Sequence, residues 1–272
     1  MGHFAGDPPR RSQTQTRIEG GVRVSDSGGD LAAPQYSSEF YSEESKSSGR
    51  SAAVIVPLLM EMVAPRSVLD VGCGVGAFLK AFSAAGVDRI FGVDGPWVPA
   101  GALQVPTESF LTADLGKAIP PVGSFDLVTC FEVAEHLSQD RAEGFVDDLC
   151  AHGPTVAFSA AIPHQGGTDH RNEQWPSYWA ALFEKRGYRT FDVLRSSLWS
   201  EPEVDRWYAQ NMILFSSAGT EFRSRDPFPL DVVHPRQFAR ACRVPSTREL
   251  SGEVLRRGLA SLRRRAGFAR GR

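Results

Sequence analysis

The chain has little of what marks secreted, zinc-bound or membrane proteins. Its 272 residues include only four cysteines, and none of them form a Cys-x-x-Cys pair, so neither a disulfide framework nor a thiolate zinc site is indicated. The longest apolar stretch, residues 52–60, contains Pro57 and is too short to span a bilayer. No apolar leader follows Met1. These absences predict a cytoplasmic protein without a membrane span.

An excess of charge of one sign is also missing. The chain has 30 basic and 32 acidic residues and a net charge of −2, so a nucleic acid is not an expected partner. Residues 1–35 are rich in glycine, serine and proline and are predicted to be disordered. Residues 219–272 form a basic extension, either a solvated helix or a patch for an anionic partner. A folded domain is therefore expected over residues 36–218.

Apolar runs alternate with helical segments through this domain. Strands are expected near residues 67–71, 89–93, 108–112, 125–131 and 155–162, and helices near 50–62, 76–85, 139–151 and 175–186. Two more strands are expected near 188–195 and 207–215, the second antiparallel because no helix is predicted before it. The alternation predicts an α/β fold with a mostly parallel seven-stranded sheet and helices on both faces.

The first expected strand runs into a loop with a glycine at every second position. Gly72, Gly74 and Gly76 follow Asp70, and glycines let the backbone turn sharply and let a ligand approach the main chain. The spacing that starts at Gly72, with Asp94 at the end of the next strand, also fits the dinucleotide fingerprint. The Asp70 carboxylate, however, would repel a pyrophosphate and would suit the amino cation of S-adenosylmethionine. The loop therefore favours S-adenosylmethionine over a nicotinamide or flavin cofactor.

Acidic residues follow the next strands as well. Asp94 could accept from both ribose hydroxyls, and Asp114 could accept from an adenine amino group. Together with the loop at 70–76 and the Glu-x-x-Glu-His segment at 132–136, these acids resemble the class I S-adenosylmethionine-dependent methyltransferases, over residues 36–216. The resemblance implies a Rossmann-like fold with its last strand antiparallel. The cofactor-binding residues that it implies are Asp70, Gly72, Gly74, Gly76, Asp94, Asp114, Leu115 and Phe131.

The acceptor is expected beyond the carboxyl ends of the fourth and fifth strands, where open α/β sheets bind ligands. An alcohol acceptor must lose a proton, which suits a histidine with a pKa near neutrality. We therefore predict catalytic roles for His136, His170 and Glu132. His164 is a weaker candidate in the polar loop at 162–176, whereas His3, His152 and His234 are expected at the surface.

No metal is predicted, although an alternative stays open. Glu132, Glu135, His136 and His170 also resemble the ligand set of small-RNA 2′-O-methyltransferases, from which the loop at 167–175 departs. Segments 158–179 and 207–211 look more like bacterial methyltransferases of glycan and secondary-metabolite pathways. That resemblance implies O-methylation of a small-molecule acceptor such as a sugar. N- or C-methylation, RNA 2′-O-methylation, a nicotinamide-dependent oxidoreductase and a non-catalytic scaffold are the alternatives.

Overall fold

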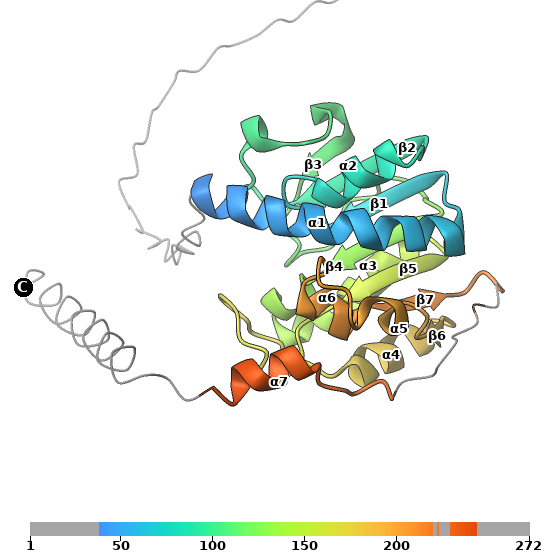
Figure 1. Ribbon diagram of the computed structural model, residues 1–272. Coiled ribbons are helices and arrows are strands. Elements are labelled where there is room, and N and C mark those ends of the chain that lie inside the picture. Colours follow the sequence, from blue (N-terminus) through green and yellow to red (C-terminus); the bar gives the residue numbers. More distant parts are fainter. Residues whose placement is uncertain (1–37, 220–221, 223–228, 244–272) are drawn as a thin grey trace, which may run out of the picture. The chain divides into compact units, whose positions relative to one another are not determined.

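A computed structural model describes residues 38–219, 222 and 229–243 (Figure 1), with side chains described from Ser47 onward. The predicted disorder of residues 1–35 and most of the basic extension lie outside this part of the chain. Within it, no helix is long and apolar enough to cross a membrane.

The centre of the fold is one seven-stranded sheet with the strand order β3-β2-β1-β4-β5-β7-β6. The strands are β1 (Ser67–Val71), β2 (Arg89–Asp94), β3 (Phe110–Thr112), β4 (Leu127–Phe131), β5 (Thr155–Ser159), β6 (Arg189–Phe191) and β7 (Ile213–Ser216). Neighbours from β3 to β5 pair in parallel, whereas β7 runs antiparallel to both β5 and β6. The predicted mostly parallel, Rossmann-like fold with an antiparallel last strand is confirmed.

Helices cover both faces of the sheet (Figure 1). They are α1 (Ser38–Val63), α2 (Ala77–Ala84), α3 (Ala142–His152), α4 (Pro176–Glu184), α5 (Arg195–Leu198), α6 (Arg206–Asn211) and α7 (Pro235–Ala241). Side chains of β4 alternate between two apolar clusters: Leu127 packs with residues of α1, α2 and α6, and Val128 packs with residues of α3 and α4. Every residue of β4 and β5 is buried, as expected of parallel strands covered on both faces.

The segment 207–215 differs from its prediction, because its first half is helical. Residues Arg206–Asn211 form α6, and β7 begins only at Ile213. Tyr208, Ala209 and Met212 are all buried in one apolar cluster, a spacing that suits one face of a helix. The aromatic residues at 207–208 favoured a strand in the sequence, but helical packing against the sheet prevails. The strand expected at 188–195 is also shorter, since α5 begins at Arg195.

Two histidines expected at the surface are buried. His152 and His234 each expose only 4% of their surface. The ring of His152 donates from Nδ1 to the carbonyl of Asp148 at 2.6 Å. His234 precedes α7, which belongs to the basic extension and packs onto the domain through the buried Gln237. Ring nitrogens of His152 and His234 that were expected to face water thus form hydrogen bonds with backbone groups.

Candidate active site

The glycine loop joins β1 to α2 and has left-handed backbone at all three predicted glycines. The φ angles of Gly72, Gly74 and Gly76 are 78°, 54° and 88°, in a region that side chains with a Cβ avoid. A Cβ on Gly72 would lie 2.2 Å from Val133 Cγ2, whereas a Cβ on Gly74 would meet no described atom within 4 Å. Gly72 is therefore required by packing, and Gly74 leaves open space beside the turn.

Asp94 at the end of β2 holds this loop in place. Its carboxylate accepts from the backbone N–H of Gly74 and of Gly95, both at 2.6 Å. Burial raises the pKa of Asp94, and the hydrogen bonds from Gly95, Gly74 and the side chain of Trp97 oppose that shift. The indole of Trp97 lies against Gly95, where an added Cβ would come within 2.2 Å of its Cζ2. Asp94 thus joins the loop, β2 and Trp97 at one point.

Asp70, in β1, is the second buried acid of this region. It exposes 3% of its surface and accepts from Thr129 Oγ1 at 2.7 Å. Burial, reinforced by the negative charge of Asp94 and opposed by the Thr129 bond, raises the pKa of Asp70 to about 7. A cation beside Asp70 would stabilise its ionised form.

Three other predicted cofactor residues have local partners of their own. Asp114 is exposed, accepts from the Gly116 N–H at 3.0 Å and pairs with Lys117 at 3.4 Å. The side chains of Leu115 and Phe131 are buried in the two apolar clusters. Their predicted contacts with a cofactor remain predictions.

Glu132, predicted to face the acceptor, directly follows β4 and adopts a left-handed backbone with φ 54°. Its two carboxylate oxygens accept from Gln165 Nε2 at 2.8 Å and from Asn211 Nδ2 at 3.0 Å. Burial raises the pKa of Glu132, and the two amide bonds work in the opposite direction. A non-glycine residue held in this backbone region is strained by about 1–3 kcal/mol, as often found at functional sites.

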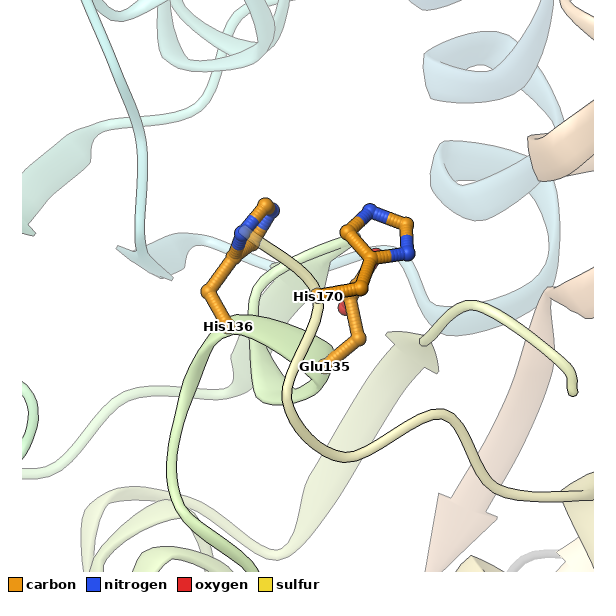
Figure 2. Close-up of side chains that lie close together, drawn as sticks. All are labelled: Glu135, His136 and His170. Carbon is orange, nitrogen blue, oxygen red and sulfur yellow. The ribbon is translucent and has the colours of Figure 1, made fainter. Parts of the chain in front are cut away.

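Glu135, His136 and His170 lie together (Figure 2), with one ligand atom from each within 4.8 Å of the others. The rings of His136 and His170 meet edge to face with centroids 5.0 Å apart. Glu135 is 1% exposed, and neither of its oxygens has a hydrogen-bond partner among the described residues. Burial and the charge of Glu132 raise the pKa of Glu135 well above its usual range. Burial and the neighbouring His170 lower the pKa of His136.

The sequence predicts Glu173 only as a polar loop residue that could bond acceptor hydroxyls, and it does not predict the pairing with His170. Its Oε1 accepts from His170 Nδ1 at 2.8 Å, and its carboxylate also accepts the backbone N–H of His164 at 2.7 Å. Burial alone would raise the pKa of Glu173, but these bonds lower it. The sequence signal for this pair is an acidic residue three positions after His170. The loop is tied down further because the N–H groups of Arg171 and Asn172 donate to the Glu135 carbonyl.

A divalent cation would find suitable donors in this cluster. One carboxylate and two imidazoles are ligands that manganese, iron and zinc accept, and the unpartnered oxygens of Glu135 fit that chemistry. Glu132 lies outside this set of three, and its oxygens accept from the amides of Gln165 and Asn211 instead. The prediction of a metal-free site therefore stays a prediction.

Residues 44–192, more than half of the chain, match the family described as "Methyltransferase domain". This chain belongs to that family. The family confirms the predicted enzyme class and cofactor, a methyltransferase that uses S-adenosylmethionine. The glycine loop, Asp94 and the Glu132–His136 segment all fall inside the matched range.

Individual relatives of this methyltransferase chain are distant. A ubiquinone biosynthesis O-methyltransferase of Acinetobacter baylyi is 31% identical over 83 residues, which are 28% of this chain and 34% of that protein. This chain thus matches about a third of the length of that curated relative.

Among solved structures, the methyltransferase domain of bacterial CtHen1-C is 20% identical, with a TM-score of 0.46, covering 62% of this chain and 98% of that one. A putative O-methyltransferase of Nostoc punctiforme is 16% identical, with a TM-score of 0.49, covering 69% of this chain and 64% of that one.

Proposed function

We propose that this methyltransferase transfers a methyl group from S-adenosylmethionine to a hydroxyl of a small polar acceptor, with a sugar hydroxyl as the leading candidate. The observation that carries the proposal is the His170–Glu173 pair, with a 2.8 Å bond, in the loop after β5. That loop lies at the carboxyl end of the parallel strands, the edge that also carries the glycine loop after β1.

The cofactor would lie on the glycine loop. The open space at Gly74 would admit a ligand to the backbone, and the Asp94 carboxylate would accept from ribose hydroxyls. Asp70 is buried with a pKa raised to about 7, so the amino cation of the methionine portion would meet a carboxyl that gains from a positive neighbour.

His170 has the properties of a general base. Its Nδ1–H is held by Glu173, which fixes the tautomer and leaves Nε2 as the acceptor of a proton. In the reaction, the acceptor oxygen forms a bond to the methyl carbon as the carbon–sulfur bond breaks. S-adenosylhomocysteine leaves, and the hydroxyl proton passes to His170 Nε2. The enzyme contributes alignment of the two reactants as well as the base.

An exposed aromatic residue of the loop after β5 supports the proposal that the acceptor is a sugar. Trp175 exposes 37% of its surface at the start of α4, and an exposed indole can stack on a sugar ring. Tyr178 and Trp179 behave differently: Trp179 is 2% exposed and packs against Phe158 with ring centroids 5.1 Å apart. Trp175 is therefore the aromatic candidate for acceptor contact.

The test is a transfer assay with methyl-labelled S-adenosylmethionine and three acceptor panels: sugars and glycosides, phenols, and amines. Label in a glycoside product, with the new methyl on oxygen by NMR, is the expected result. Label only on nitrogen or carbon would overturn the O-methylation proposal. The His170→Ala variant should lose the transfer, and its binding of S-adenosylhomocysteine should stay near normal.

A second candidate is metal-assisted methylation of a hydroxyl, favoured by the cluster of Glu135, His136 and His170. Residues of this cluster would hold a divalent cation, which would supply a positive charge that acidifies the hydroxyl. Transfer that stops with EDTA and returns with Mn²⁺ would support this route. Transfer that is unchanged by EDTA supports His170 as the base.

A further inference from the structure

The described part of the basic extension is firmly bound to the methyltransferase domain. Arg195 is fully buried, with 0% of its surface exposed, and donates to the carbonyls of Pro229 and Leu230, both at 2.8 Å. Asp231 then accepts from the backbone N–H of Ser177 at 2.9 Å and from its hydroxyl at 2.7 Å. Residues 229–231 are thus fixed at the start of α4, next to the loop that carries His170 and Glu173.

His234 continues this attachment and begins α7. Its ring donates from Nε2 to the Trp199 carbonyl at 2.7 Å and accepts the Arg236 N–H on Nδ1 at 3.0 Å. Its backbone N–H donates to Gln210 Oε1 at 2.8 Å. Both ring nitrogens are used, so the direction in which α7 leaves the domain is set.

Gln237 is the residue of α7 that reaches inward. It is 3% exposed, and its Nε2 donates to the backbone carbonyl of Gln165 at 3.0 Å. Its Oε1 accepts from Arg206 Nε at 2.8 Å. Gln237 therefore fixes the backbone at Gln165, a residue in the loop after β5.

The side chain of Gln165 is hydrogen-bonded to Glu132, the catalytic candidate, so a fixed Gln165 also restrains Glu132. Gln165 Nε2 donates to Glu132 at 2.8 Å, and Gln165 Oε1 accepts from Asn211 at 2.9 Å and from Gln210 at 3.2 Å. Asn211 donates to the other Glu132 oxygen at 3.0 Å. Gln165, Gln210 and Asn211 expose 6% or less of their surface.

We propose that Gln237 is a positioning residue of the acceptor site, and that the segment 229–241 completes this site by orienting Glu132 through Gln165. The proposal rests on the proposed function and on the catalytic role that the sequence predicts for Glu132. A buried carboxamide can be held in either of two orientations, and here every amide is fixed by the next in the series. A buried polar network of this kind stabilises one arrangement only when each member is satisfied. Removal of the Gln237 donor takes away the bond to the Gln165 carbonyl, so the backbone of Gln165 keeps, among the described residues, only its N–H bond to Ile162. The orientation of Glu132 is then less defined.

The experiment is NMR measurement of solvent exchange at the carboxamide protons of Gln165 and Asn211, in the full chain without ligands. The Gln237→Met variant keeps the size of the side chain but removes both hydrogen bonds. We expect exchange at Gln165 and Asn211 to become about ten-fold faster, as for the loss of roughly one buried hydrogen bond. The matched control is Gln139→Met, at an exposed position outside the network, and it should leave the exchange unchanged.

A second variant separates positioning from simple anchoring of α7. Gln237→Glu keeps an acceptor for Arg206 but places a carboxylate oxygen against the Gln165 carbonyl, where a donor is required. Faster exchange in this variant supports the proposal, because the Arg206 contact survives. Unchanged exchange in both variants would overturn it. Calorimetry with S-adenosylhomocysteine tests the proposed function separately, and the affinity should change less than about two-fold in either variant. Failure of the wild type to bind would contradict the proposed function, whereas the exchange rates test the positioning of Glu132 by Gln237.

Discussion

On the proposed donor side, around the glycine loop, the predicted cofactor-binding residues lie close together along the chain or at the ends of adjacent strands. Asp70 and the three glycines fall within seven residues, and Asp94 ends the neighbouring strand β2, which pairs with β1. On the acceptor side, Glu132 is held by Asn211, 79 residues away, and by Gln165, 33 residues away. The first side is shaped by backbone conformation, and the second by side-chain hydrogen bonds between distant segments.

This difference bears on how each side responds to change. The donor side uses backbone N–H groups and left-handed glycines, so substitutions there act on the turn itself. The acceptor side uses a polar network in which each side chain depends on others. A substitution on one side should therefore leave the other side largely intact, and four tests address one side or the other.

The largest expected effect separates turnover from donor binding. His170→Ala should lower methyl transfer by about 10²–10⁴-fold, the usual contribution of a general base, because the variant lacks the imidazole that is proposed to accept the hydroxyl proton. Calorimetry with S-adenosylhomocysteine should show near-normal affinity. The matched control is His164→Asn, an exposed residue of the same loop with φ 66°, since asparagine tolerates that backbone. Full turnover in His170→Ala would show that His170 is not the base.

The second test compares two glycines of one turn. Gly72→Ala should lower the free energy of unfolding by about 2–5 kcal/mol, because left-handed strain adds to the overlap with Val133. Gly74→Ala has the strain without the overlap and should lower it by about 1–2 kcal/mol. Urea denaturation measures both. Equal losses in the two variants would contradict the packing role assigned to Gly72.

The third test is Asp94→Ala, which removes the proposed ribose acceptor. Two hydrogen bonds to a charged group are lost, so the affinity for S-adenosylhomocysteine should fall by roughly 100-fold or more. Asp88→Ala is the control. Asp88 is exposed, directly precedes the first residue of β2, and pairs with Arg66. An unchanged affinity in Asp94→Ala would mean that the donor site is misplaced.

The smallest effect is a proton released on donor binding. Burial raises the pKa of Asp70 to about 7, so this carboxyl is partly protonated near pH 7 in the free protein. A nearby amino cation lowers this pKa, so binding of S-adenosylhomocysteine near pH 7 should release a fraction of a proton per chain. Calorimetry in buffers of different ionisation enthalpy measures the release. Asp70→Asn should abolish it, and a release that persists in this variant would point to another group.

The same contrast explains what could be predicted from the sequence. The sheet, the glycine loop and Asp94 follow from local patterns: apolar runs, glycine spacing and acids at strand ends. His170 and Glu132 could be named because their loops follow strands of the sheet. The groups that position Glu132 could not be paired with it from the sequence, since Asn211 lies in a segment predicted to be a strand. Gln237, which reaches Glu132 only through Gln165, lies in the basic extension. The positions of Asn211 and Gln237 depend on contacts between segments far apart in sequence, and such contacts cannot be predicted from the periodicity of apolar residues.

The proposed donor side requires that the glycine loop and Asp94 bind S-adenosylmethionine. Calorimetric titration of the full chain with S-adenosylhomocysteine, and separately with NAD, tests it most directly. We expect saturable binding of S-adenosylhomocysteine at one site per chain and no binding of NAD. Binding of NAD, or no binding of S-adenosylhomocysteine, would contradict it.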